Sequence, residues 1–215
     1  MKLIKPSVEL VTVTPNALQV IEQAGRICYK SEGSITDDSA GRFVQNIIKR
    51  DHGAVLEHAG ATIKFVCDRG VSHEIVRHRV ASYCQESTRY CNYSQGKFGS
   101  EVTYVKPTWV ELQYDLRPIS EFLEACKDAE RHYLNLIKCG LKPEEARAVL
   151  PTCVKTELVM TANMREWRHF FKLRCSKRAH PDMRRVAKLA LIELHNAVPV
   201  VFDDLYSQFI EGDQD

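Results

Sequence analysis

The densest group of chemically useful side chains lies between residues 77 and 90. This stretch reads Arg-His-Arg-Val-Ala-Ser-Tyr-Cys-Gln-Glu-Ser-Thr-Arg-Tyr. Arginine forks pair with phosphate oxygens, hydroxyl and amide groups pair with the edge of a base, and aromatic rings stack on its face. The stretch therefore indicates a nucleotide site. An exposed polar loop with incidental arginines is the alternative.

Any phosphate would have to be held largely by side chains. No two glycines lie two residues apart, so the dinucleotide fingerprint Gly-x-Gly-x-x-Gly is absent, and so is the phosphate loop Gly-x-x-x-x-Gly-Lys. Arginine suits this task because its planar fork makes paired bonds to phosphate and stays charged.

A second basic group lies between residues 165 and 188. It holds nine lysines or arginines against two acidic residues. For most of them, a solvated basic surface is the simplest interpretation. The basic residues are Arg165, Arg168, Lys172, Arg174, Lys177, Arg178, Arg184, Arg185 and Lys188.

Arg174 differs from the others by its position on the predicted helix. At about 100° per residue, Met164, Trp167 and Phe171 fall within about 60° of one another, and Arg174 projects about 20° from Trp167. A guanidinium at the edge of this apolar stripe is expected to face an anion or a dipole, because an unpaired buried charge is costly. Lys172 and Arg165 lie on the opposite side, where solubility alone would explain them.

Hydrolytic centres are less well supported. His73 and His78 are five residues apart, about 140° on a helix, whereas a zinc protease helix needs a spacing of four. His52 and His58 could join Glu57 and distant residues at a metal, but structural histidines are a simpler explanation. We therefore expect no metal. A Cys/His nucleophile pair stays open, because eight cysteines and eight histidines make chance pairs abundant.

Composition limits the class of protein. The chain has 215 residues, with 30 Lys+Arg against 28 Asp+Glu and a net charge of +2. This balance disfavours a surface built entirely for duplex nucleic acid. We expect no secretory leader, and the sequence contains no membrane-length apolar run, so we expect a soluble protein without membrane attachment. The eight cysteines form no Cys-x-x-Cys pair and indicate reduced thiols in the cytoplasm.

Hydrophobic periodicity and helix caps predict the elements that position these residues. The stretch 78–100 lacks aliphatic periodicity, and so long a loop inside a compact domain is usually functional. We expect one α+β domain over residues 1–215, with a β-sheet flanked by helices. Helices are predicted at 15–29, 37–50, 71–77, 120–137, 143–150, 163–174, 181–198 and 199–210, strands at 8–13, 59–67 and 102–105, and a strand or helix at 154–161.

Several ordered motifs resemble one family. Arg77-His78-Arg79, followed by seven residues and Ser87, resembles the signature of the flavin-dependent thymidylate synthases. The similarity spans roughly residues 8 to 210. Residues 52–58 resemble that family's upstream histidine segment, and residues 145–151, 161–165 and 173–174 resemble its downstream blocks in order.

This resemblance implies an activity. Reduced FAD and methylenetetrahydrofolate would methylate dUMP at C5 to give dTMP and tetrahydrofolate, and NADPH would re-reduce the flavin. It also implies a homotetramer whose active sites are shared between subunits. A nucleic-acid-binding module built on residues 165–188 is the rival hypothesis, and the nearly neutral composition disfavours it.

The resemblance also implies contacts for each ligand. Arg174 is the expected catalytic residue, because a cation beside the pyrimidine stabilises the negative charge that makes C5 nucleophilic. Ser87 is expected to be a ligand contact, since local spacing places no histidine to activate it. FAD would contact His52, Arg77, His78, Arg79, Gln85, Asn163, Arg165 and His169, and dUMP would contact Glu74, Arg77, Gln85, Ser87, Arg89, Arg147 and Arg174.

Five positions depart from the common pattern of that family. Cys84 stands where Asn is usual, and Glu74 and Gln85 stand where many relatives have Gln and Glu. These three alter hydrogen-bond polarity in the expected dUMP loop. His169 replaces a frequent Asn, and Arg178 replaces a frequent His, which adds charge near an expected phosphate and favours a tighter grip on FAD.

Overall fold

The computed structural model describes residues 1–96 and 99–212. Lys97 and Phe98, at the end of the predicted polar loop, and residues 213–215 lie outside the described part. Tertiary contacts divide the chain into two compact units, and one domain over residues 1–215 stays a prediction. The first unit comprises Met1–Ser7, Val66–Ile75 and Cys84–Leu158, and the second comprises Val8–Phe65, Val76–Tyr83 and Val159–Asp215.

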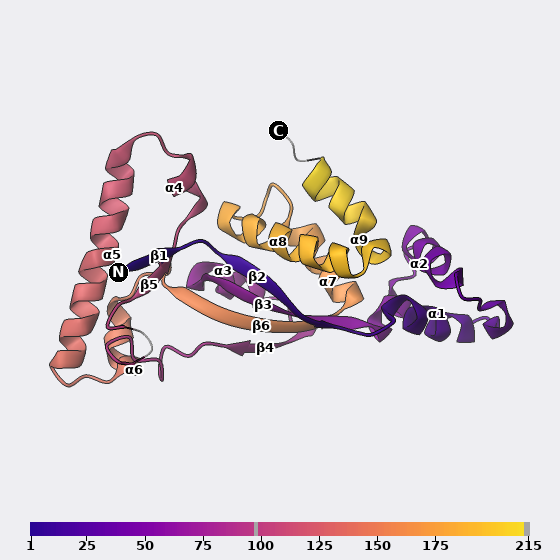
Figure 1. Cartoon of the computed structure of the whole chain (residues 1–215), viewed down its shortest axis with the longest axis horizontal. Helices are drawn as coiled ribbons and strands as arrows, with labels where there is room; N and C mark the ends of the chain where they lie inside the picture. Colours follow the sequence, from indigo (N-terminus) through magenta and orange to yellow (C-terminus); the bar gives the residue numbers. More distant parts are fainter. Residues whose placement is uncertain (97–98, 213–215) are drawn as a thin grey trace. The chain divides into compact units, whose positions relative to one another are not determined.

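The elements form the expected α+β class, with sheets flanked by helices (Figure 1). Short 3-10 turns occur at Glu32–Ser34, Gly53–His58 and Arg147–Val149, and a π-helical turn at Ser207–Glu211 follows the last helix. The strands are β1 (Lys2–Ile4), β2 (Ser7–Val13), β3 (Gly60–Asp68), β4 (Ala81–Gln85), β5 (Thr103–Val105) and β6 (Lys155–Asn163). The helices are α1 (Ala17–Ile27), α2 (Ser39–Lys49), α3 (Arg69–Ile75), α4 (Thr108–Leu112), α5 (Leu116–Lys138), α6 (Pro143–Ala146), α7 (Met164–Arg174), α8 (Pro181–Ala197) and α9 (Pro199–Tyr206).

A four-stranded sheet has the order β2-β3-β6-β4. Burial alternates along β3 and β6, as expected for strands with one face against a core. β2 and β6 each run antiparallel to β3, because Thr14 N at the end of β2 and Met164 N at the end of β6 donate to carbonyls at the start of β3, at 2.9 and 2.8 Å. The ambiguous segment at 154–161 is therefore a strand.

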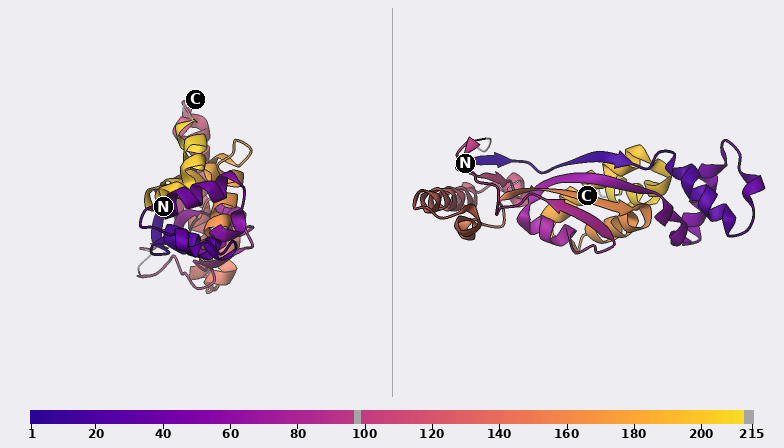
Figure 2. Two further views of the ribbon diagram at one scale, coloured as in Figure 1. Left: turned by 90° about the vertical axis from the view of Figure 1, so that its right-hand side faces the viewer. Right: turned by 90° about the horizontal axis from the view of Figure 1, so that it is seen from below.

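In the second unit, α7 packs on the sheet through aromatic side chains. Trp167 Nε1 donates to Ala61 O at 3.1 Å, and the Phe65 ring lies 6.3 Å from both Trp167 and Phe170. Met164, Trp167 and Phe171 are fully buried, which confirms the predicted apolar stripe. Figures 1 and 2 show α7 and α8 on one face of the sheet, with α9 packed against α8.

The first unit has its own core between a strand pair and α5. β1 pairs in parallel with β5, so that Leu3 lies opposite Tyr104. Tyr104 OH donates to Cys126 O at 3.0 Å, and Tyr133 OH accepts from Tyr93 N at 3.3 Å. These buried rings therefore satisfy their polar atoms inside the core. All eight cysteines are free thiols.

Several predicted boundaries were wrong. α5 begins at Leu116, before the predicted cap Ser120, because Asp115 Oδ1 accepts from Arg117 N at 2.9 Å. α1 begins after Asn16, whose φ of 52° lies in the left-handed region. Three short elements, β1, α4 and β4, were not predicted. Among the described residues, no helix combines the length and the apolar character needed to cross a membrane.

Candidate active site

The segment Arg77-His78-Arg79 lies between α3 and β4. α3 ends at Ile75, close to the predicted end. Arg77 and Arg79 are exposed, whereas His78 is 5% exposed. This alternation is typical of an extended chain, in which every second side chain shares a side. The two arginines are thus available to a ligand while the histidine is fixed beneath them.

His78 connects two residues of α7. Its Nδ1 lies 3.1 Å from Glu166 Oε1, and its Nε2 accepts a hydrogen bond from Arg174 Nε at 3.1 Å. An acceptor nitrogen carries no proton, so the proton of the neutral ring is on Nδ1 and is donated to the Glu166 carboxylate. Tyr83 OH donates to His78 O at 2.6 Å and holds the backbone. His78 is therefore fixed at both ring nitrogens and at its carbonyl.

The surroundings keep His78 neutral. Burial lowers the pKa of His78, and the positive charge of Arg174 adds to this, whereas Glu166 opposes it; the net shift is downward. Burial also raises the pKa of Tyr83 to about 12, with a smaller contribution from Glu166. At neutral pH the site therefore holds an uncharged imidazole beside the Arg174 guanidinium.

α7 positions Arg174 through its buried face. Asn163 caps the helix, because its Oδ1 accepts from Glu166 N at 2.8 Å. The aromatic residues of α7 then pack inward and leave Arg174 half-buried at the last position of the helix. The expectation that Arg174 faces an anion or dipole is confirmed, since the His78 ring is the dipole. Lys172 is exposed, as the helical wheel predicts.

Among the described residues, one cluster of His, Cys, Asp or Glu side chains is close enough to hold a metal ion. It consists of His78, Glu166 and His169, whose ligand atoms lie within 4.8 Å of one another. Both ring nitrogens of His78 already have hydrogen-bond partners in Glu166 and Arg174. Glu166, His78 and Arg174 are therefore linked by hydrogen bonds. The centroid of the exposed His169 ring lies 5.7 Å from that of the His78 ring. The expectation of no metal stays a prediction.

The remaining expected FAD contacts of the second unit line its cavities. His52 and Arg165 line a cavity of about 930 Å³ between α1, α2 and residues 51–55. Arg165 and His169 line a cavity of about 280 Å³, and Asn163 lines one of about 410 Å³. Arg165 is exposed and pairs with Glu57 Oε1 at 2.5 Å.

The first unit holds the remaining expected dUMP contacts. Gln85, at the end of β4, donates from Nε2 to the buried hydroxyls of Ser72 and Thr156 at 2.9 and 3.2 Å. Glu74 is half-buried on α3. These contacts fix the Gln85 amide within the unit.

Two arginines and a serine of the expected dUMP set lie close together in the same unit. Arg147 Nη1 donates to Thr88 Oγ1 at 2.8 Å, next to Ser87, and Ser87 Oγ accepts from Arg89 N at 3.3 Å. Arg89 and Arg147 are both exposed, and Arg89 Nε lies 3.6 Å from Glu144. This geometry gives one group of exposed guanidinium and hydroxyl donors, which suits a phosphate.

Comparison with known proteins decides the family. Residues 9–200 match the family described as thymidylate synthase complementing protein. A protein of Geobacter sulfurreducens named flavin-dependent thymidylate synthase is 34% identical over 205 residues, covering 92% of this chain and 85% of the relative. The chain belongs to the flavin-dependent thymidylate synthase family. It is therefore an enzyme of the flavin-dependent methyltransferase class.

Other relatives agree. A flavin-dependent thymidylate synthase of Pyrococcus abyssi is 34% identical over 194 residues, covering 87% of this chain and 78% of the relative. The crystal structure of a UMP/dUMP methylase from Streptomyces cacaoi, bound with 5-Br dUMP, has a TM-score of 0.78 at 22% identity and covers 97% of this chain and 98% of its own. That likeness supports the family fold.

Three of the five departures from the common family pattern are exposed. Cys84 is exposed on β4, His169 is exposed on α7, and Arg178 is exposed in the turn between α7 and α8. Gln85 is half-buried, and its amide donates to the two buried hydroxyls of Ser72 and Thr156. A glutamate at that position could donate to neither hydroxyl, and the Ser72 hydroxyl already donates to Arg69 O at 3.0 Å.

Sequence reasoning missed the partners of two residues of α7 in this member of the flavin-dependent thymidylate synthase family. Glu166, which orients His78, gave no sequence signal, because its partner lies 88 residues away. Arg168 was assigned to the solvated surface but is buried and bonded to Asp204 and to Val201 O. Its position, four residues after Met164 and three before Phe171, already places it on the apolar stripe.

Proposed function

We propose that this chain is a cytoplasmic thymidylate synthase that converts dUMP to dTMP, with methylenetetrahydrofolate as carbon donor and FAD re-reduced by NADPH. Family membership supports the reaction class. The observation that carries the proposal is the hydrogen bond from Arg174 to the buried, neutral His78, beside two exposed arginines. This arrangement offers a fixed cation for a pyrimidine and free forks for phosphate.

In this proposal the second unit supplies most FAD contacts. The residues fit the cofactor, because exposed arginines can pair with its phosphates and histidine rings can stack on its planar rings. Bound FAD would supply the hydride that completes the new methyl group. The contacts of the second unit are His52, Arg77, His78, Arg79, Asn163, Arg165 and His169, and Gln85 is contributed by the first unit.

The first unit supplies the phosphate contacts of dUMP. Arg89 and Arg147 provide exposed forks, and Ser87, next to the Thr88 hydroxyl that Arg147 contacts, provides a hydroxyl. Gln85 and Glu74 add a fixed amide and a carboxylate for the edge of the base. Arg77 and Arg174 complete the proposed set from the second unit.

Arg174 is the proposed catalytic residue. The bond from Nε to His78 fixes one edge of its planar guanidinium. A fixed cation beside a pyrimidine carbonyl stabilises the negative charge that develops as C5 becomes nucleophilic, without reorganising during the reaction. Because His78 is neutral, it orients Arg174 without cancelling its charge.

The test of this function starts with colour. The purified protein is expected to be yellow, to release FAD on denaturation, and to form dTMP from dUMP only with methylenetetrahydrofolate and NADPH. Absorbance spectra and chromatography of the products measure this. A colourless protein that fails to take up added FAD, and that binds nucleic acid with strongly salt-dependent affinity, would instead support the nucleic-acid-binding module.

We also propose a homotetramer with active sites shared between subunits. Dilution below the dissociation constant of the assembly is then expected to lower dUMP turnover and FAD content together, because each site would lose a subunit. Sedimentation velocity and activity over the same concentration range measure this. Full activity in a demonstrated monomer would refute shared sites.

A further inference from the structure

The cavity of about 930 Å³ in the second unit has more basic residues than the proposed FAD contacts account for. The last turns of α1 and the length of α2 form its walls, and residues 51–55 and Arg165 close it. Its described lining includes four arginines, with Asp51 as the one acidic residue among them. Three of these arginines have an acidic partner outside the lining, Glu22, Asp38 or Glu57, so the cavity attracts an anionic ligand mainly through Arg50 and the weakly paired Arg42.

One wall is a row of donors on α2. Arg42, Asn46 and Arg50 are spaced four residues apart, so they lie on one face of the helix, and all three line the cavity. At 1.5 Å per residue, the row extends over about 12 Å. All three side chains are exposed. A ligand lying along α2 would therefore meet a hydrogen-bond donor at about every 6 Å.

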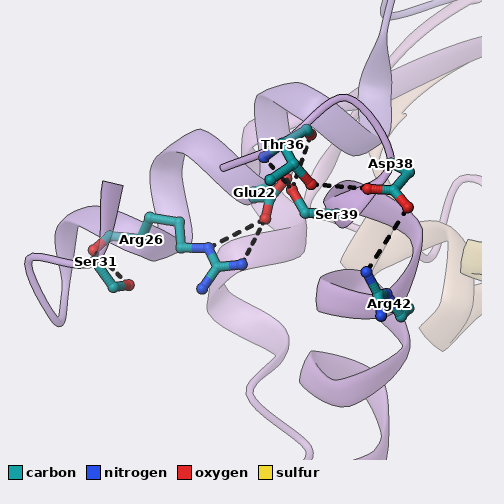
Figure 3. Close-up of polar contacts among 7 residues, drawn as sticks. All are labelled: Glu22, Arg26, Ser31, Thr36, Asp38, Ser39 and Arg42. Carbon is teal, nitrogen blue, oxygen red and sulfur yellow. Dashed lines mark hydrogen bonds and ion pairs between the residues drawn. The ribbon is translucent and has the colours of Figure 1, made fainter. Parts of the chain in front are cut away.

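A buried carboxylate holds the opposite wall in place. Glu22 is 1% exposed and accepts from Arg26 Nε and Nη2 at 3.1 and 2.8 Å and from Ser39 Oγ at 2.7 Å (Figure 3). Ser39 Oγ in turn accepts from Thr36 N at 3.0 Å. This network ties the 31–39 segment to both helices, so Arg26 presents its guanidinium from a fixed position.

Arg42 is bound much more weakly than Arg26. Its guanidinium lies 3.8 Å from Asp38, and the two side chains are 78% and 82% exposed. An exposed pair at this distance contributes little, so a phosphate can replace Asp38 as the partner of Arg42. Figure 3 shows Arg42 on the other side of the network from Arg26.

The cavity also offers an aromatic surface. Tyr29, just after α1, is 77% exposed and lines the cavity. Gly25 allows the helices to approach closely here, because a Cβ at this position would lie 2.5 Å from the Phe43 ring. An exposed ring next to arginines is suited to stack on a base whose phosphates pair with the guanidinium groups.

We propose that this cavity binds the reduced nicotinamide dinucleotide phosphate, with its phosphates along Arg42, Asn46 and Arg50 and its adenine near Tyr29. This inference rests on the proposed function, in which NADPH is a charged dinucleotide to which no residue has been assigned. His52 and Arg165, two proposed FAD contacts, line the same cavity. A dinucleotide lying along α2 thus extends to the residues that contact the flavin.

Calorimetric titration of the FAD-loaded enzyme with NADP⁺ tests the site. In the double variant Arg42→Ala/Arg50→Ala the affinity for NADP⁺ is expected to fall about tenfold or more, because two charge-assisted partners of the phosphates are lost. Lys49→Ala is the matched control, since Lys49 is an exposed cation of α2 that does not line the cavity. Its affinity is expected to equal that of the wild type.

Three results would overturn the proposal. The first is an unchanged NADP⁺ affinity in the double variant. The second is loss of bound FAD from the double variant, which would make the cavity part of the flavin site. The third is a double variant that binds methylenetetrahydrofolate more weakly but NADP⁺ as well as the wild type does. A separate assay tests the proposed function independently of the NADPH site. The chemically reduced wild-type enzyme should form dTMP from dUMP and methylenetetrahydrofolate without NADPH, and its failure would count against the function and not against the cavity.

Discussion

Replacing Arg174 by alanine is expected to lower the turnover of dUMP about a hundredfold or more, because loss of one fixed electrostatic donor typically has this effect. The FAD content should stay close to that of the wild type. The fold should survive, since losing the hydrogen bond to the buried His78 ring costs about 1–3 kcal/mol. Steady-state kinetics with methylenetetrahydrofolate and NADPH, together with thermal unfolding, measure both effects.

Two further variants of α7 decide how Arg174 acts. Arg174→Lys keeps the charge but loses the planar fork, so it is expected to restore little activity. Lys172→Ala removes an exposed cation about 160° away on the same helix and should be nearly neutral. Near-normal dTMP formation by Arg174→Ala, or equal damage by Lys172→Ala, would show that the placement of α7 against the ligand is wrong.

The sequence predicted α7 well because its signals are local. The cap Asn163 and the aromatic residues at helical spacing are all visible within twelve residues. The position of Arg174 at the edge of the stripe follows from the same spacing. Its partner His78 is 96 residues away, so only the three-dimensional structure shows which dipole it meets.

The polar stretch after His78 shows where sequence reasoning fails. β4 contains Ala81, Tyr83 and Gln85 as half-buried residues that alternate with exposed Ser82 and Cys84. The alternation is present, but alanine and glutamine carry too little hydrophobic contrast to reveal it. The strand forms because it pairs with β6, a contact between residues more than seventy positions apart.

The large cavity lined by arginines had no sequence signal either. Its walls come from α1, α2, the 51–55 segment and α7, and no motif connects them. Glu22 illustrates the reason, because a glutamate on a helix usually faces water. Here it is buried by Arg26 and by Ser39, which lies 17 residues away. Buried polar groups of this kind follow from tertiary pairing, which local periodicity does not encode.

Arg168→Ala is expected to lower the free energy of unfolding by about 3 kcal/mol. This value is at the low end of the usual cost of breaking a buried ion pair, because the Asp204 side chain is half-exposed. Arg168 makes two hydrogen bonds to the Asp204 carboxylate, at 2.7 and 2.6 Å, and a third to Val201 O. For a chain of this size the melting temperature should fall by about 6–12 °C. Chemical denaturation and calorimetry measure the two quantities.

The pH dependence of the stability lost in Arg168→Ala distinguishes loss of the ion pair from loss of side-chain packing. Burial alone would raise the pKa of Asp204, but the hydrogen bonds and charge of Arg168 outweigh it, so the pKa is lowered. A lowered carboxyl pKa stabilises the folded state above its unfolded value of about 3.9, and this contribution disappears as pH falls through the folded pKa. The difference in stability between wild type and Arg168→Ala should therefore shrink from pH 7 to pH 3. Lys49→Ala, which removes an exposed cation of α2 that has no proposed ligand contact, should change stability by no more than about 0.5 kcal/mol. An Arg168→Ala deficit that stays constant with pH would mean that the aliphatic stem of Arg168, and not its charge, stabilises the contact between α7 and α9.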